Sequence, residues 1–578
     1  MAPTDQLQEV KIMLHGTAAS EGIGIGKVML IEEHSLEYTP RTVTDTEAES
    51  QRFKAAVDAF CYNTEKQAEN LRSSAGEKEA EILAGHIQII KDPYLSGEIE
   101  KLIADGQCAE SALEHMCDMF IAMFSAADDE LTKQRAADVR DIKSGVLGIL
   151  LGVNEIKVSD APKGTVLVAR ELTPSVTAGI VKENIAGIIT ETGGTTSHSA
   201  ILARALEIPA VLSVEGVASS LKNGDTVVVD GSEGAVIVNP DDNTVAEYSK
   251  KRDAFLAERK ELENYRGRET KSASGEVYEL FCNIGKPEDA VKAVDADGEG
   301  VGLFRTEFLF MDRTSIPTED EQFEAYKKAA LILKGKSLII RTLDIGGDKD
   351  IPYLGLEKEE NPFMGFRAIR YCLKNRELFK SQIKAILRAS AFGDIKIMFP
   401  LITTVDELRE GKKLVAECKA DLRNMDINFN ENIQVGVMVE TASAAVIADM
   451  LAKEADFFSI GTNDLTGYTM ACDRGNNDVS YLYSPLQPSV LRMIKRTIEC
   501  GVQNGISVGM CGEAAANKLM IPLLISFGLT EFSVSAPSVL NVRKIISTWT
   551  KEEADKVTEK VLEMSTQQEI VEYLKSVV

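Results

Sequence analysis

The chain has 578 residues, enough for about two to four domains, and its 64 basic and 90 acidic side chains give a net charge of −26. A surface of this sign repels polyanions, so we expect binding neither to nucleic acid nor to an anionic membrane. No apolar run approaches the roughly 18 residues of a transmembrane helix, so we expect no insertion into a membrane.

The nine cysteines are scattered without CxxC spacing. This pattern favours reduced thiols in a cytosol over a disulfide framework or a zinc site. The first residues, MAPTDQLQEVKIM, lack a basic segment followed by an apolar core, so we expect no export signal. The predicted location is therefore the cytoplasm.

The N-terminal part of the chain changes character near residue 36. Residues 9 to 33 contain short apolar runs with glycines, which are typical of strands and turns. Residues 36–150 have helical periodicity with almost no proline, which predicts an all-helical insert. Between residues 35 and 150 there are 22 acidic and 12 basic side chains. This surplus fits either a solvated helix surface or a docking face for a basic partner.

Strand and helix signals alternate from about 160 to 240. They predict a compact α/β domain of the swivelling type, formed by residues 1–35 together with 151–240. Residues 241–272 are charged, helical in pattern and poor in large apolar side chains. We therefore expect a linker helix there, joining two halves of the protein.

A single histidine, His198, stands in the stretch GGTTSHSAILARALEIP. Gly193 and Gly194 permit a tight turn, the hydroxyl residues 195–197 offer helix caps, and the apolar segment that follows is helix-forming. A lone histidine is usually a structural residue whose polar atoms are hydrogen-bonded within the protein. At a helix N-terminus, however, a neutral imidazole is favoured and an attached anion is stabilised. We therefore interpret His198 as a nucleophile that carries a phosphoryl group.

The second half of the chain contains eight short apolar runs separated by helical segments. Eight strand–helix alternations in about 300 residues predict a (β/α)8 barrel over residues 273–578. The runs are 277–285, 300–308, 337–344, 395–402, 433–441, 457–464, 506–513 and 531–535.

Polar residues recur at the C-terminal end of these runs, where a barrel of this kind places its chemistry. They are Asn283, Arg305, Glu307, Arg341, Asp344, Glu440, Asn463, Asp464 and Cys511.

Four guanidinium groups belong to these strand–helix units: Arg305, Arg341, Arg367 and Arg474. Each offers a planar fork of donors suited to phosphate or carboxylate. Some of them could instead form structural bridges with Glu307 or Asp344. Several arginines together in a strongly acidic protein nevertheless indicate a doubly anionic small molecule.

Glu440 and Asp464 follow neighbouring strands, and no histidine or cysteine cluster accompanies them. Ligands that are all oxygen select Mg²⁺, with Mn²⁺ as an alternative, over zinc or copper. Both carboxylates could instead neutralise arginines. Cys511, flanked by glycines in GMCGE, is either an inert packing residue or a donor and acceptor of protons.

Taken together, the motifs resemble enzyme I of the bacterial sugar phosphotransferase system, a member of the phosphoenolpyruvate-utilising family. The resemblance covers essentially the whole chain. It implies that phosphoenolpyruvate binds the barrel and phosphorylates His198, which then passes the phosphoryl group to a histidine of the phosphocarrier protein HPr, with release of pyruvate. This is the first step of sugar uptake by that system. The motifs are GGTTSHSAILARALEIPAV, GVGLFRTEFLFMDR, RTLDIGGDK, NPFMGFRAIR, FSIGTNDLTGYTMACDRGN and GMCGE.

The resemblance also assigns roles to residues. Glu440 and Asp464 match the Mg²⁺ ligands, and Cys511 matches the residue that handles protonation of the enolate. The helical insert corresponds to the docking site for HPr, and the family forms homodimers through the barrel. The residues implied to bind the substrate are Arg305, Arg341, Asn463, Arg474 and Arg367.

The chain departs from the family pattern at Glu21, Val176, Gly179 and Gly467, and none of these is a residue assigned to chemistry. The departures near residue 176 affect how the loop that contains His198 is positioned. Thr177 is therefore a candidate for stabilising that loop.

Three rival functions fit parts of the sequence less well. A dikinase would need a large ATP-grasp domain, for which the chain has neither the length nor a nucleotide loop. A stand-alone lyase barrel would turn over without His198. A signalling scaffold would have no use for the complete polar set at the strand ends.

Overall fold

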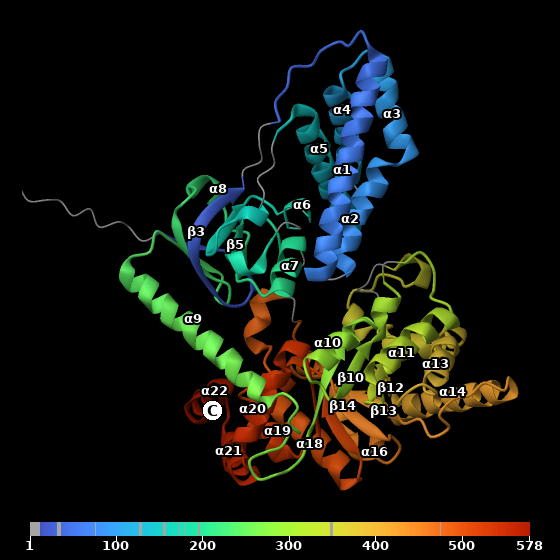
Figure 1. Cartoon of the computed structure of the whole chain (residues 1–578). Coiled ribbons are helices and arrows are strands. Elements are labelled where there is room, and N and C mark those ends of the chain that lie inside the picture. Colours follow the sequence, from blue (N-terminus) through green and yellow to red (C-terminus); the bar gives the residue numbers. More distant parts are fainter. Residues whose placement is uncertain are drawn as a thin grey trace, which may run out of the picture. The chain divides into compact units, whose positions relative to one another are not determined.

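The computed structural model describes residues 12–31, 36–74, 77–126, 130–153, 158–172, 174–177, 180–194, 197–311, 313–346, 351–473 and 476–578 (Figure 1). The chain divides into two compact units, Met1–Arg259 and Lys260–Val578. The main apolar clusters of the first unit share no residue with the large core of the second. Within the described ranges we find no helix with the length and apolar character of a membrane span.

The first unit contains an eight-stranded sheet with the strand order β1-β8-β7-β3-β4-β5-β6-β2. The four strands from β3 to β6 run parallel, whereas the pairs on both flanks are antiparallel. The strands are β1 (Ile12–His15), β2 (Thr17–Ser20), β3 (Ile23–Ile31), β4 (Thr165–Ala169), β5 (Ile185–Thr190), β6 (Ala210–Leu212), β7 (Thr226–Asp230) and β8 (Ala235–Val238). Three short helices accompany the sheet: α6 (Pro174–Thr177), α7 (His198–Leu206) and α8 (Val217–Ser220).

Five helices lie between β3 and β4 in the sequence and form a separate bundle, coloured blue to teal in Figure 1. Apolar side chains on their facing sides, such as Phe53, Leu113 and Val139, form a core that belongs to these helices. This is the packing that the 3.6-residue periodicity predicts. The helices are α1 (Thr46–Ser74), α2 (Glu77–Ile90), α3 (Pro93–Ala104), α4 (Ala109–Ser125) and α5 (Glu130–Leu151).

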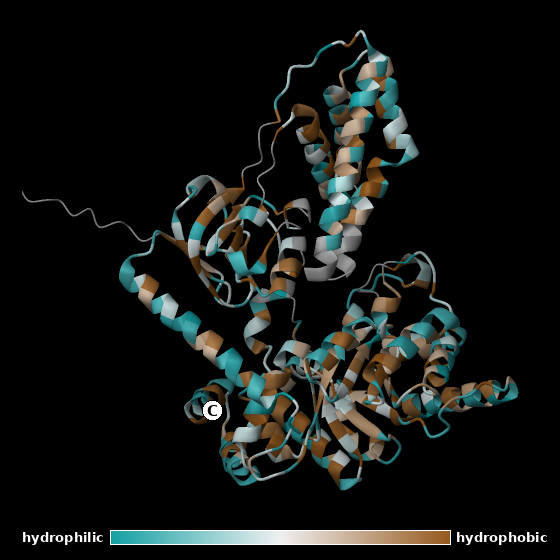
Figure 2. Ribbon diagram, in the orientation of Figure 1, coloured by the Kyte–Doolittle hydropathy of each residue, from teal (hydrophilic) through white to brown (hydrophobic). Residues whose placement is uncertain are grey.

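A long polar helix, α9 (Asp242–Leu262), carries the chain from the first unit into the second. Hydrophilic residues cover most of its surface (Figure 2), and its buried side chains are Thr244 and Tyr248. A helix that is polar on nearly all sides is typical of a solvated connection.

The second unit is a closed barrel of eight parallel strands, in which β16 pairs with β9 to complete the ring. Together with the sheet and the helical bundle of the first unit, this confirms the predicted fold class. The strands are β9 (Glu279–Ile284), β10 (Gly300–Arg305), β11 (Leu338–Arg341), β12 (Ile395–Phe399), β13 (Val435–Val439), β14 (Phe457–Ile460), β15 (Ser507–Met510) and β16 (Glu531–Val534).

Helices surround the barrel and bury the outer faces of its strands in one large apolar core. Capping boxes begin four of them, where a threonine and a glutamate three positions later satisfy each other's backbone groups. The helices are α10 (Asp289–Asp295), α11 (Glu319–Leu333), α12 (Ala368–Lys374), α13 (Arg376–Ala389), α14 (Val405–Asn424), α15 (Ala442–Val446), α16 (Ala448–Leu451), α17 (Thr462–Met470), α18 (Pro488–Gln503), α19 (Ile521–Phe527), α20 (Val539–Thr548), α21 (Lys551–Glu563) and α22 (Gln567–Val577).

Several observed strands end earlier than the apolar runs predict. The run 457–464 becomes β14 up to Ile460, and α17 already begins at Thr462. The run 300–308 becomes β10 up to Arg305, followed by a 3-10 turn. Arg305 is therefore the last residue of its strand, Glu307 lies in the 3-10 turn, and Asn463 and Asp464 lie in the first turn of α17.

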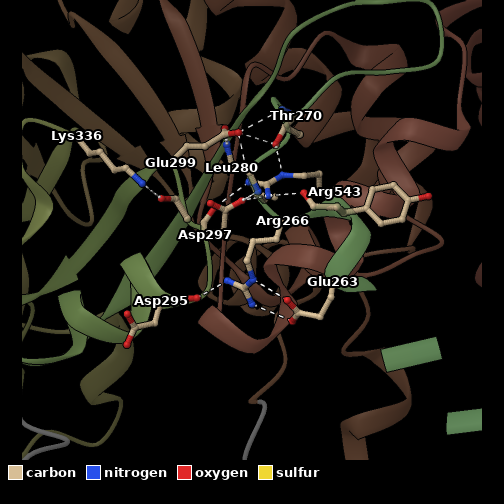
Figure 3. Close-up of polar contacts among 12 residues, drawn as sticks. Glu263, Arg266, Thr270, Leu280, Asp295, Asp297, Glu299, Lys336 and Arg543 are labelled. Carbon is tan, nitrogen blue, oxygen red and sulfur yellow. Dashed lines mark hydrogen bonds and ion pairs between the residues drawn. The ribbon is translucent and has the colours of Figure 1, made fainter. Parts of the chain in front are cut away.

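Arg543 of α20 fastens the segment that follows α9 to the barrel (Figure 3). Its side chain is almost completely buried and donates hydrogen bonds to the Tyr265 carbonyl at 3.1 Å and to the Thr270 hydroxyl at 3.0 Å. It also pairs with the carboxylates of Asp297 and Glu299. One guanidinium thus links a C-terminal helix, the incoming chain and the turn before β10.

Candidate active site

Arg305 and Arg341 end neighbouring strands, β10 and β11, and are paired in register. Register partners in a parallel sheet point to the same face. The Arg341 guanidinium is buried and pairs with Glu307 at 2.7 Å and Asp344 at 2.9 Å. The Arg305 side chain is exposed and makes no ion pair or hydrogen bond with any residue that the structure describes. The free guanidinium of Arg305 is thus next to that of Arg341, whose charge is compensated by two carboxylates.

Asp344 joins two of the arginines that the sequence analysis singled out. Its carboxylate accepts hydrogen bonds from Arg367, at 2.8 Å from Nη2 and 3.2 Å from Nε, in addition to the pairing with Arg341. Arg367 also approaches the Asp464 carboxylate, at 3.4 Å. The sequence predicts Asp344 at the barrel mouth and as a candidate structural bridge to the arginines. The structure contains this bridge, in which Asp344 holds the guanidinium groups of Arg341 and Arg367 close together.

Three carboxylates meet at the barrel mouth. Oxygen atoms of Asp344, Glu440 and Asp464 lie within 4.8 Å of one another. Burial, together with the charges of Asp464 and Asp344, raises the pKa of Glu440, because three negative groups repel one another in a site with little water. A divalent cation would offset that repulsion, and an all-oxygen set suits a hard ion. The residues fit a metal site, with Asp344 as a member that the sequence analysis did not assign to it.

Cys511 follows β15 and is almost completely buried. Burial raises the pKa of its thiol to about 11, while the Ser459 hydroxyl and the charges of Arg341 and Arg305 oppose that rise. The group is therefore a protonated thiol at neutral pH, suited to donating a proton rather than to attacking as a thiolate.

Asn463 lies in the first turn of α17, next to the acidic cluster. Its amide donates to the Glu513 carboxylate at 3.3 Å and accepts from the Glu513 backbone N–H at 3.4 Å. These contacts join the TNDL motif to the GMCGE motif. Arg474 lies outside the described residues.

Tyr468 of α17 is a contact residue that the sequence analysis missed. Its hydroxyl lies 3.4 Å from Nη1 of Arg367 and donates to the Phe363 carbonyl. The Arg367 guanidinium also stacks on the Phe363 ring, 5.7 Å from its centre. Tyr468 therefore holds the loop that delivers Arg367. Its only sequence signal is its position four residues after Asp464, one helical turn along the same face.

The backbone of His198 begins helix α7 of the first unit, and Ser197 caps that helix by accepting from the Ala200 N–H at 3.3 Å. The predicted helix start is thus observed. The side chain of His198 and residues 195–196 lie outside the described part of the structure. Thr177, the candidate support, is buried in α6, which packs against α7.

Within the barrel, the arrangement combines a free guanidinium, two bridged guanidinium groups, a carboxylate cluster and a protonated thiol. Such a set can bind a small anion that carries more than one acidic group, hold a divalent cation against it and supply a proton. The histidine belongs to the other unit of the chain.

Family models match three consecutive regions of the chain. Residues 15–135 match "PEP-utilising enzyme, N-terminal", residues 161–234 match "PEP-utilising enzyme, mobile domain", and residues 259–550 match "PEP-utilising enzyme, PEP-binding domain". The last match alone spans half of the chain and contains the barrel residues described above.

Curated relatives match over nearly the full length. A phosphoenolpyruvate-protein phosphotransferase of Bacillus subtilis is 47% identical over 570 residues, which are 98% of this chain and 99% of that protein. The proteins of the same name from Listeria innocua and Priestia megaterium are each 45% identical, covering 97% of this chain and 98% of theirs. An NMR structure of the enzyme I protein nEIt is 37% identical over 42% of this chain and 99% of that chain, with a TM-score of 0.38.

Proposed function

The chain belongs to the PEP-utilising enzyme family, and on that premise we propose that it transfers the phosphoryl group of phosphoenolpyruvate to His198 and then to a histidine of HPr, releasing pyruvate. It is a phosphotransferase of the enzyme I type that uses phosphoenolpyruvate. The carrier protein, the phosphohistidine and the released pyruvate are the parts of this scheme that we propose.

The pairing of arginines at the barrel mouth carries the proposal. Phosphoenolpyruvate has a phosphate and a carboxylate, and therefore needs several cationic partners in one place. Arg305 is exposed and unpaired among the described residues, so it is ready to accept an anion without breaking an existing bridge. Arg341 stands beside it in register, and Arg367 is joined to Arg341 through Asp344. We assign Arg305 and Arg341 to the phosphate, with Asn463, Arg474 and Arg367 as further substrate-binding residues.

Glu440 and Asp464 are the proposed ligands of Mg²⁺, with Mn²⁺ as an alternative, and Asp344 lies within reach of the same ion. When bound, the ion offsets the charge that develops on the phosphate and carboxylate oxygens. Asp344 keeps Arg341 and Arg367 oriented towards the substrate, because its two oxygens occupy one guanidinium each.

In the transfer step, an imidazole nitrogen of His198 forms a bond to phosphorus while the bond from phosphorus to the enol oxygen breaks. The enolate that remains takes a proton at C3 from the Cys511 thiol and becomes pyruvate. At the N-terminus of α7, backbone N–H groups and the helix dipole favour the phosphorylated state of the imidazole. The barrel supplies positioning and electrostatic stabilisation for this transfer.

The division of the chain fits a relay. We propose residues 1–35 with 151–240 as the phosphohistidine domain, 36–150 as the HPr-docking subdomain, 241–272 as the linker and 273–578 as the substrate barrel. A phosphohistidine domain that is separate from the barrel must travel to it and away again, which a polar connecting helix allows. The acidic surplus of the docking subdomain favours a basic face on HPr. The proposal includes a homodimer formed through the barrel and a bacterial cytoplasmic location.

Labelling with phosphoenolpyruvate tests the proposal. The full chain, incubated with Mg²⁺ and phosphoenolpyruvate labelled in its phosphate, is expected to take up one acid-labile phosphate per chain, which mass mapping assigns to His198. His198→Ala should abolish the label, whereas His115→Ala, at an exposed histidine of α4, should retain it. Addition of HPr should discharge the label. Mapping to any residue other than His198 would reject the proposal.

A further inference from the structure

The guanidinium of Arg341 has one edge that is only half used. At its other end, Nη1 pairs with the Asp344 carboxylate at 2.9 Å and approaches the Met438 sulfur at 3.6 Å. The edge formed by Nε and Nη2 is suited to binding two oxygens of one anion at once. There Nη2 donates to Oε1 of Glu307 at 2.7 Å, whereas the buried Nε has no hydrogen-bond partner in the described part of the chain. This edge therefore holds Glu307 by one contact instead of two.

The carboxylate of Glu307 is used just as incompletely. Its Oε2 is buried and accepts no hydrogen bond from any residue that the structure describes. A carboxylate that faces this edge of an arginine squarely uses both oxygens, as Glu431 does at the surface, where it accepts from Nε and Nη2 of Arg423 at 2.7 Å each. Buried polar atoms without partners are unfavourable. An anion with two well-placed oxygens would therefore fit the Nε–Nη2 edge of Arg341 better than Glu307 does.

Arg341 is held in place by contacts that do not involve Glu307. Its backbone carbonyl accepts a hydrogen bond from the Thr306 hydroxyl at 2.8 Å, and this hydroxyl in turn accepts from the Gln382 amide at 3.1 Å. Asp344 holds the other end of the guanidinium. An exchange of partners at the Nε–Nη2 edge therefore leaves both the backbone and the Nη1 end of Arg341 fixed.

Glu307, in contrast, has little to hold it at this edge. It lies in the 3-10 turn Thr306–Leu309 that follows β10, and Arg341 is the only partner of its carboxylate among the described residues. Its side chain is 12% exposed. An outward rotation of the side chain would therefore bring a displaced carboxylate into water at the barrel mouth, where its charge is solvated.

We infer that Glu307 occupies the place of the substrate's phosphate on Arg341 and gives up the Nε–Nη2 edge when phosphoenolpyruvate binds. The inference rests on the proposed function, in which Arg341 binds that phosphate. It makes Glu307 a residue that competes with the substrate and thereby sets which anions are bound. A phosphate displaces Glu307 because it offers two oxygens to the edge and carries more charge than one carboxylate.

The competition excludes weakly bound anions. Every anion that takes this edge must first displace Glu307, so each loses the same free energy of binding. A ligand with a single acidic group then retains little affinity. Phosphoenolpyruvate tolerates the loss because its second acidic group gains contacts elsewhere in the site.

Equilibrium binding tests the inference. Phosphoenolpyruvate and Mg²⁺ are titrated calorimetrically into the full chain that carries His198→Ala, so that binding is measured without transfer. Glu307→Gln, added to this chain, keeps the shape of the side chain but removes the charge that competes for Arg341. The affinity should rise by about tenfold, the lower end of what a hydrogen bond between charged groups contributes. Inorganic phosphate should gain by the same factor, because the loss depends on Glu307 and not on the anion that displaces it.

Two further variants separate competition from structural damage. Glu431→Gln removes a carboxylate from the same edge of the surface residue Arg423 and should bind phosphoenolpyruvate like its parent. Glu307→Ala removes the competing group altogether and should also tighten binding. The rise of its unfolding temperature with phosphate concentration measures this affinity even where the variant is less stable.

Unchanged or weaker binding of phosphoenolpyruvate by Glu307→Gln would overturn the inference, because loss of a group that merely supports the site does not tighten binding. A wild-type chain that fails to label His198 would instead reject the proposed function. Titration with inorganic phosphate would still decide the role of Glu307, so the two failures are distinguishable.

Discussion

At the scale of single residues, identical side chains are held differently because their partners differ. Arg305 and Arg341 follow similar strands and are paired in register, yet one is free and the other is held by two carboxylates. A buried guanidinium with two acidic partners is held at a fixed place, whereas an exposed one without partners among the described residues is free to move towards an incoming anion. The same reasoning separates Glu531, a buried carboxyl whose Oε1 has no hydrogen-bond partner among the described residues, from the paired acids at the barrel mouth.

Burial raises the pKa of Glu531 to about 8, which predicts a dependence of stability on pH. The folded state keeps the proton up to about pH 8, whereas an unfolded glutamate with the ordinary pKa of 4.5 has already lost it. The unfolded state therefore binds fewer protons over this window, and the free energy of unfolding falls as pH rises from about 5 to 8. Glu531→Gln removes this contribution.

Calorimetry at pH 5 and pH 8 measures the effect. The stability of the variant relative to the wild type should rise by at most about 1.4 kcal/mol per pH unit across this range and level off above pH 8. A difference between variant and wild type that does not change with pH would mean that Glu531 titrates normally in the folded protein.

At the scale of elements, the ends of strands and helices position the functional groups. Strands β13, β14 and β15 stop before Glu440, Asp464 and Cys511, so these residues lie beyond the strand ends at the barrel mouth. On the other side of the same scaffold, α20 uses one buried arginine to fasten the chain that arrives from α9 (Figure 3). The end of the connection is therefore fixed to the barrel from Tyr265 onward, and any change of direction must lie before that point.

Removal of this anchor should destabilise the barrel. Arg543→Ala leaves the Asp297 and Glu299 carboxylates and the Tyr265 carbonyl without their shared donor, a loss of roughly 3 kcal/mol for a broken buried pair. Lys544→Ala is the matched control, because its pair with Glu261 lies at the surface and should contribute about 1 kcal/mol or less. Calorimetry of the full chain measures both. Equal transition temperatures for the two variants would show that the anchor contributes no more than a surface pair.

At the scale of the whole molecule, two compact units contain the residues proposed for different parts of the reaction. The first has the histidine at the start of α7, and the second has the arginines, the carboxylates and the thiol. Each unit has its own core, so a defect in one site leaves the other folded. The two half-reactions should therefore be separable by mutation.

Asp464→Ala should separate them. Loss of this proposed metal ligand is expected to lower phosphorylation of His198 by phosphoenolpyruvate more than about 1,000-fold, because the charge on the transferred group is no longer offset. Phosphorylated HPr should still return its phosphate to His198 at the wild-type rate, since that exchange does not involve the barrel. Asp449→Ala, at a surface pair with Arg496, controls for the loss of an acid. Failure of both reactions in Asp464→Ala would mean that the units do not divide the chemistry in this way.

Much of the architecture was predictable. The 3.6-residue periodicity indicated the helical bundle, eight apolar runs indicated the barrel, and the position of polar residues after those runs indicated its mouth. Strand ends were less predictable, because the apolar pattern continues past the last ladder hydrogen bond, as in the segment 457–464. Tyr468 and the place of Asp344 in the carboxylate cluster were missed, because their partners lie in other strand–helix units.

The amino-acid pattern alone established the order of the elements, the motifs and the types of group available for chemistry, since these depend on neighbours along the chain. Which guanidinium is free, which carboxylates crowd together and which acid, Glu531, is buried at Gly302 and Gly509 emerged only when the barrel closed. Those properties depend on burial and on distances between segments far apart in sequence, because desolvation and Coulomb interactions act through space.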